Sequence, residues 1–130
     1  MLFSHSKQWL SVGFIAGILF FIIRYRELSY LPIVSLFDIT FFFAWLLSAG
    51  YILFVKEGMG RLAHVLALTI VNGIFISDLF LDKAVHPLNP LLNSYWLGIH
   101  VPAVILAYSA FGISFAISVY YIIADTKRTP

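Results

Sequence analysis

Apolar residues dominate four long runs of this chain, at about residues 9–25, 31–55, 62–81 and 95–124. A helix needs about 20 mostly apolar residues to cross the hydrocarbon core of a bilayer, because each residue adds about 1.5 Å of length. The first run is short and the fourth must tilt or protrude, but all four qualify. The pattern therefore predicts an all-α, polytopic membrane bundle of four transmembrane helices, with residues 1–130 forming a single domain.

Tight connections separate the runs. The sequences RELSY and KEGMGR join the first three runs, and the longer DKAVHPLNPLLNS precedes the fourth. Pro87 and Pro90 exclude regular helix from that last connection, and Asn93 or Ser94 is placed to cap the helix that follows. Pro32 is expected in the first turn of the second helix, where its missing N–H does no harm.

The composition agrees with this class. Hydrophobic residues make up 62% of the chain and charged residues 11%, and the mean hydropathy is +0.97. Soluble domains carry about 25% charged residues. The absence of cysteine excludes disulfides, cysteine metal sites and a thiol relay within this chain. A net charge of +2 gives no reason to expect a nucleic-acid partner, so the lipid bilayer is the expected environment.

The distribution of lysine and arginine predicts the orientation, because cytoplasmic connections carry an excess of both. One side of the predicted bundle has five: Lys7, Lys56, Arg61, Lys127 and Arg128. The other side has three: Arg24, Arg26 and Lys83. We therefore expect both termini in the cytoplasm and the loop that contains His86 outside.

Small residues predict where helices pack, because close backbone approach drives association in lipid. Gly13 and Gly17 form a GxxxG motif in the first helix. The fourth helix carries a stripe of small residues, Ala103, Ala107, Ala110, Ser114 and Ser118. His100 precedes this stripe by one turn and shares its face, so we expect the imidazole to point toward protein.

Ionisable side chains inside membrane helices are functional candidates, because lipid does not solvate their charge. Asp38 is interpreted as an interfacial carboxylate that bonds Ser35 or a neighbouring loop, and Asp78 as a solvated helix end. His64 is expected to be solvated at the inner membrane interface, and His86 is assigned to the solvated outer loop.

His100 differs because it lies about one and a half turns inside its helix, with Trp96 before it and Pro102 after it. Its Nε2 atom can bind a metal, or the imidazole can bond a carbonyl that Pro102 leaves free, and spacing alone does not decide. His64 is roughly 25 Å away along the helix direction, so the two cannot share an iron. If His100 is an axial ligand, the other ligand is expected outside this chain.

The region around His100 resembles the cytochrome c assembly family of haem-handling membrane proteins, in particular its CcsA (ResC) branch. A segment of the type P-x-L-x-S-x-W-L-x-x-H-V is matched by Pro90, Leu92, Ser94, Trp96, Leu97, His100 and Val101, followed by Tyr108. A second-helix pattern is matched by Pro32, Ser35, Asp38 and Trp45. The resemblance covers roughly residues 10–125, and the His100 segment is its specific part.

The resemblance implies a role in attaching haem to apocytochrome c on the outer face of a bacterial cytoplasmic or thylakoid membrane. It implies haem b as the cofactor, His100 as an axial ligand of the haem iron, and Trp96, Pro102 and Tyr108 as haem-binding residues. No catalytic residue is assigned. The implied partners are a CcsB/ResB-like membrane protein, apocytochrome c, and a chain or segment that supplies the family's tryptophan-rich WWD loop and the second haem ligand. The sequence itself lacks that loop, so it is expected to be part of a haem-lyase system rather than catalytic alone.

Two other classes remain open. The chain is alternatively a non-haem structural or transport subunit, in which His100 only satisfies helix packing. A proton or ion pathway is the third possibility, and it requires Asp38, Asn72, Asp78 and His100 to face one cavity.

Overall fold

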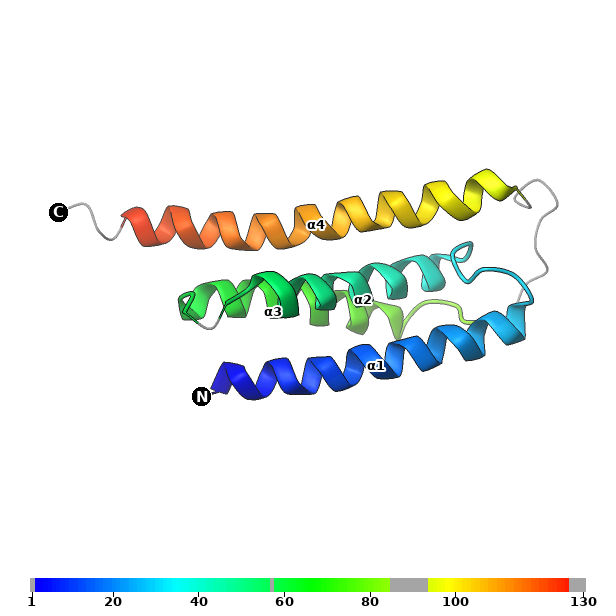
Figure 1. The fold of residues 1–130 in the computed structure, drawn as a ribbon, viewed down its shortest axis with the longest axis horizontal. Coiled ribbons are helices and arrows are strands. Elements are labelled where there is room, and N and C mark those ends of the chain that lie inside the picture. Colours follow the sequence, from blue (N-terminus) through cyan, green and yellow to red (C-terminus); the bar gives the residue numbers. More distant parts are fainter. Residues whose placement is uncertain (1, 57, 85–93, 127–130) are drawn as a thin grey trace.

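A computed structural model describes residues 2–56, 58–84 and 94–126, and these contain four helices and no strand. The helices are α1 (Leu2–Leu28), α2 (Leu36–Phe54), α3 (Arg61–Asp78) and α4 (Tyr95–Thr126). Successive helices run in opposite directions, so the two termini lie at the same end of the bundle (Figure 1). All four are long and apolar enough to cross a membrane. The predicted all-α bundle of four transmembrane helices is confirmed, and the chain is an integral membrane protein.

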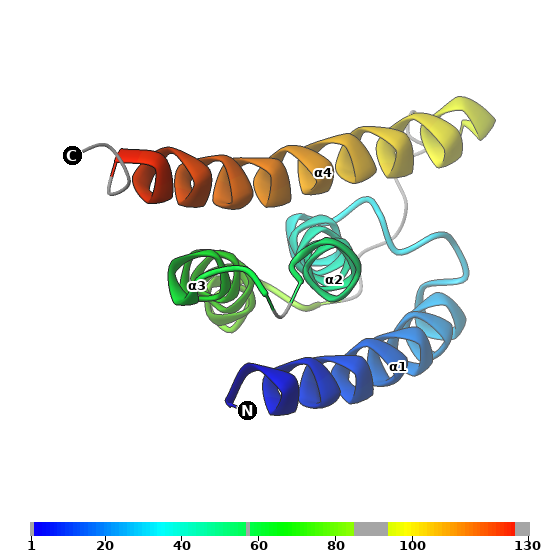
Figure 2. The same ribbon diagram turned by 60° about the vertical axis from the view of Figure 1, so that its left-hand side comes forward.

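Helix α2 is the central element, because it packs against each of the other three helices (Figure 2). The main core lies where α2, α3 and α4 meet, and its buried residues are Leu47, Tyr51, Val55, Ala63, Ala67, Val71, Ile113 and Ala116. Helix α1 packs mainly on α2 through aromatic side chains. The rings of Phe14 and Trp45 stack with centroids 4.4 Å apart, and the Trp45 indole donates a 2.9 Å hydrogen bond to the Phe14 carbonyl.

Helices α1 and α2 differ most from their predicted bounds, and α1 begins at Leu2 instead of about residue 9. Helix α1 continues to Leu28 and ends before Ser29, which has a left-handed φ of 59°. Helix α2 begins at Leu36 because the Ser35 hydroxyl accepts a 3.0 Å hydrogen bond from the Asp38 amide and caps it. Placing Pro32 in the first turn of this helix was therefore wrong. At α4, the Ser94 hydroxyl accepts a 3.3 Å hydrogen bond from the Trp96 amide, as one predicted cap requires.

Helix α4 packs on the bundle with the face opposite to the predicted one. Its buried residues are Ile105, Ser109, Ile113 and Ala116, whereas the predicted stripe, Ala103, Ala107, Ala110, Ser114 and Ser118, is exposed. The buried face also offers small groups, and Gly112 lies directly against Leu47 of α2. Small residues occur on two faces of α4, and the buried face is not the predicted one.

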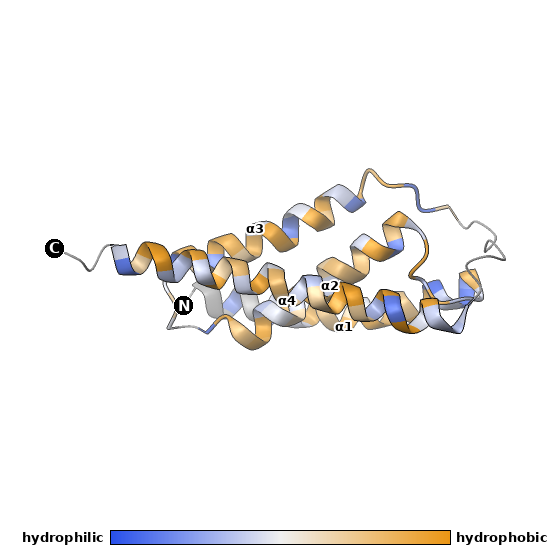
Figure 3. Cartoon of the chain, turned by 90° about the horizontal axis from the view of Figure 1, so that it is seen from above, coloured by the Kyte–Doolittle hydropathy of each residue, from blue (hydrophilic) through white to orange (hydrophobic). Residues whose placement is uncertain are grey.

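Apolar residues predominate along all four helices, as the hydropathy colouring of Figure 3 shows. Exposed large hydrophobic side chains occur on every helix, for example Ile15, Leu53, Ile76 and Phe111. Such a surface is typical of a protein surrounded by lipid.

Candidate functional site

A buried ion pair joins α1 to α2 at the end of the bundle where α4 begins. The Arg24 Nε atom lies 3.0 Å from Asp38 Oδ1, and the two residues are only 6% and 1% exposed. Ser35 donates a further hydrogen bond to the Asp38 carboxylate, and Arg24 donates a 3.0 Å bond to the Lys83 carbonyl. The predicted bond to Ser35 is confirmed, but the sequence analysis missed Arg24, the principal partner. The only signal was opposite charge at the facing ends of consecutive helices.

Asp78 is buried, with 3% of its surface exposed, although it is the last residue of α3. Its carboxylate accepts a hydrogen bond from the Thr40 hydroxyl of α2. The prediction of a solvated helix end was wrong because α2 extends past this point and covers the side chain.

His64 lies in the first turn of α3 and is fully buried against α2. Its Nδ1 atom is 3.0 Å from the Tyr51 hydroxyl, and the two rings meet edge to face. The prediction of a solvated interfacial histidine was wrong, because His64 shares the inward face of α3 with Ala63 and Ala67. It lies at the opposite end of the bundle from His100 (Figure 1), so the two imidazoles cannot share an iron.

His100 is exposed on the second turn of α4. Its ring lies nearly parallel to that of Trp96, with an interplanar angle of 15° and centroids 6.4 Å apart. The expectation that it points toward protein was wrong within the described residues, because the buried face of α4, which includes Ile105 and Ser109, is on the far side. No described residue hydrogen-bonds the imidazole, so the bond to a carbonyl near Pro102, one of the two alternatives for His100, is not formed there.

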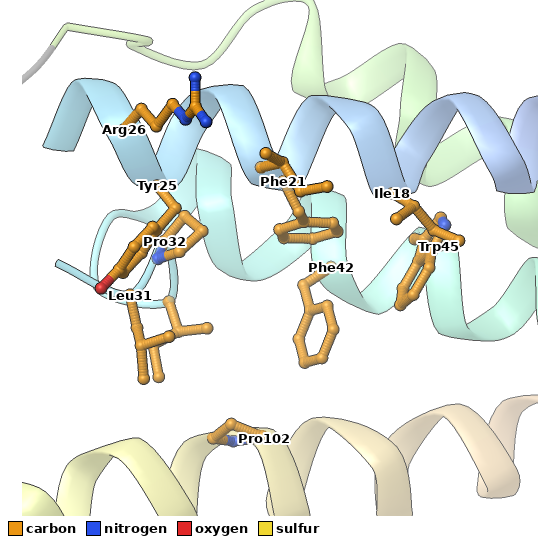
Figure 4. A pocket seen from close by; sticks show the side chains of 11 residues that line it. Ile18, Phe21, Tyr25, Arg26, Leu31, Pro32, Phe42, Trp45 and Pro102 are labelled. Atoms are coloured by element: carbon orange, nitrogen blue, oxygen red, sulfur yellow. The ribbon is translucent and has the colours of Figure 1, made fainter. Parts of the chain in front are cut away.

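The other predicted haem-binding residues divide between two sides of α4. Pro102 is about 200° around the helix from His100, and it lines a groove of about 480 Å³ between α1 and α4 (Figure 4). Phe21, Phe42 and Trp45 project into the same groove. Tyr108 is exposed two turns beyond His100. The structure therefore brings Trp96 to His100 and places Pro102 elsewhere.

The four polar residues of the hypothetical ion pathway do not share a cavity. Asp38 and Asp78 are each buried with separate partners, whereas His100 faces outward. Asn72 is exposed, and its side chain bonds the Leu68 carbonyl of its own helix. An ion pathway formed by this set is therefore contradicted.

Several predicted residues lie outside the described part of the chain, namely His86, Pro87, Pro90, Leu92 and Asn93. The part that the structure describes contains no group of three or more histidine, cysteine, aspartate or glutamate residues that could hold a metal ion. A haem iron is held by one or two axial ligands from protein, so such a group is not required. Among the described residues, His100 offers an exposed imidazole, and Trp96 lies beside it.

Residues 18–129 match the family described as Cytochrome C assembly protein. A protein of Gloeobacter violaceus named cytochrome c biogenesis protein CcsA is 32% identical over 109 residues, which is 81% of this chain and 32% of the relative. CcsA proteins of Synechococcus sp. strain JA-2-3B'a(2-13) and Synechococcus elongatus are 31% and 33% identical over 104 residues, or 77% of this chain, and 30% and 32% of each relative. The chain spans about a third of the length of these relatives.

Proposed function

The chain belongs to the cytochrome c assembly family, and on that premise we propose that it takes part in cytochrome c biogenesis by holding haem at its His100 end. The observation that carries the proposal is the exposed imidazole of His100, stacked on Trp96 and turned away from the other three helices. The haem is the cargo, and its vinyl groups are what react with the thiols of apocytochrome c.

The residues near His100 fit one side of a haem. Histidine is a common axial ligand of haem iron in proteins. Ala103 and Ala107 follow on the same face of α4, and their small side chains leave room beside the imidazole for a flat macrocycle. Trp96 lies one turn before His100 with its ring nearly parallel to the imidazole, so it borders the space around this ligand.

The second axial ligand comes from outside the described residues. His64 is buried at the other end, and His5 lies in α1 near the same end as His64. We infer that a partner chain or another segment supplies this ligand together with the WWD loop of the family. A CcsB/ResB-like membrane protein and apocytochrome c are the further partners in this proposal.

The count of lysine and arginine, rather than net charge, sets the orientation of membrane helices. Five of these residues lie on the side of the termini, and three, Arg24, Arg26 and Lys83, lie on the other side. This supports cytoplasmic termini and an outer position for His100, in a bacterial cytoplasmic or thylakoid membrane.

Haem retention tests the proposal. The chain is purified with haem, with and without the complementary segment of a CcsA relative, and the Soret absorbance is measured for the wild type, His100→Ala and His5→Ala. We expect His100→Ala to lose the Soret band and His5→Ala to keep it, because His5 is exposed at the opposite end. Equal retention of haem by the two variants contradicts the ligand assignment.

A non-haem structural subunit is a second candidate, because the exposed stripe of Ala103, Ala107 and Ala110 is suited to close packing of another helix. Under this alternative, purified protein is colourless with every partner, and His100→Gln leaves assembly of the complex unchanged.

A further inference from the structure

A second groove lies at the end of the bundle opposite to His100, between the start of α3 and the end of α4. Its volume is about 490 Å³. The apolar walls are Leu62 and Val65 on α3 and Ile123 and Ala124 on α4. None of these residues belongs to the proposed haem site, so the groove requires its own explanation.

One end of this groove is positively charged. Arg61 lines it with an exposed guanidinium, and no described residue forms an ion pair with that group. The first backbone hydrogen bond of α3 runs from the Ala63 amide to the Gly60 carbonyl, so the amides of Arg61 and Leu62 lie ahead of the hydrogen-bonded ladder. Such amides carry the positive end of the helix dipole.

Gly60 is what allows α3 and α4 to form this site. It caps α3 without a side chain, and a Cβ atom at this position would overlap the ring of Tyr120 on α4. The Tyr120 ring therefore closes the groove beside the amides of α3. Tyr120 is followed one turn later by the apolar wall residues Ile123 and Ala124.

The surrounding charges favour an anion. Lys56 at the end of α2 is exposed and adds a second cation to this end of the bundle. Asp125 is the acidic residue described on α4 at this end; it does not line the groove, but it lines a smaller adjoining pocket with Tyr120 and Ala124. Arg61 begins a membrane-spanning helix, which places its guanidinium at the level of lipid headgroups.

We propose that this groove binds one anionic phospholipid, with an acyl chain between Val65 and Ile123 and the phosphate at Arg61 and the first turn of α3. A phospholipid matches both parts of the groove, since its acyl chain suits the apolar walls and its phosphate suits the cationic end. The inference does not depend on haem binding, because it uses the other end of the molecule.

Native mass spectrometry of the full chain in detergent micelles tests this binding, with phosphatidylglycerol and phosphatidylcholine as probes. We expect Arg61→Gln to lower the affinity for phosphatidylglycerol about five-fold, which corresponds to ~1 kcal/mol for one cation at an anionic surface. The matched control Arg26→Gln removes an exposed arginine at the other end and is expected to change the affinity little. Equal affinities of the two variants overturn the proposal.

A second variant separates the acyl chain from the phosphate. Ala124→Leu fills part of the groove and keeps Arg61, so we expect it also to weaken phosphatidylglycerol binding, while excess inorganic phosphate does not displace the lipid. Displacement of the lipid by inorganic phosphate would instead indicate a free-anion site. If the wild type instead forms dimers without any lipid adduct, and Ala124→Leu abolishes these dimers, a second copy of the chain occupies the groove. Either displacement by phosphate or such a dimer overturns the proposal.

Discussion

Replacing Asp38 with asparagine removes the charge that neutralises Arg24 and keeps the size of the side chain. Both residues are almost fully buried, and their ion pair is 3.0 Å long. Removing one partner of such a pair leaves a charge without compensation in a medium of low polarity, which typically costs about 3–5 kcal/mol. We therefore expect Asp38→Asn to lower the free energy of unfolding by about this amount.

Glu27 provides a matched control, because it is the second acidic partner of the same arginine. Its carboxylate lies 3.5 Å from Arg24 Nη1, but its side chain is 53% exposed. An ion pair with that much exposure contributes about 0–1 kcal/mol, so Glu27→Gln is expected to be nearly neutral. The two variants remove the same charge and differ in burial.

Reversible unfolding in mixed detergent micelles, followed by far-UV circular dichroism, measures both free energies. The double variant Arg24→Met with Asp38→Leu removes both charges and is expected to be more stable than Asp38→Asn alone. If Asp38→Asn and Glu27→Gln destabilise the protein equally, burial does not control the strength of the ion pair.

Two further predictions concern the packing of the bundle. Tyr51→Phe removes the hydroxyl that bonds buried His64 and should lower the free energy of unfolding by about 1–3 kcal/mol in the same assay; a value near zero contradicts this contact. Gly17→Val should lower the free energy of unfolding by about 1–3 kcal/mol, because a side chain at this position overlaps the Trp45 ring. Gly13→Val is the control on the same helix and should be close to neutral, because no atom lies near that position. Similar losses for the two glycines would show that α1 does not pack on Trp45.

The existence of the helices could be predicted from sequence because apolar runs of spanning length have few other structures available in lipid. Their ends were less predictable, since they depend on local contacts such as the capping of α2 by Ser35. The apolar run from residue 31 gave no sign that the helix starts five residues later.

The inward faces could not be predicted, because a lipid-facing surface is as apolar as a packed one. Helix α4 has small residues on two sides, Ala103 and Ala107 on one and Ser109 and Gly112 on the other. Only the positions of α2 and α3 decide which side is buried. The same limit explains Asp78 and His64, because both were judged from their places near helix ends and are covered by residues of α2.

Chemical rescue tests most directly whether the His100 imidazole ligates haem iron. His100→Gly removes the imidazole and leaves a space on the exposed face of α4 beside Trp96. Haem-loaded chain with its complementary segment is compared by Soret absorbance before and after imidazole is added. We expect His100→Gly to lose the Soret band of the wild type and to regain it with imidazole. An unchanged Soret band in His100→Gly without imidazole would show that His100 is not a ligand.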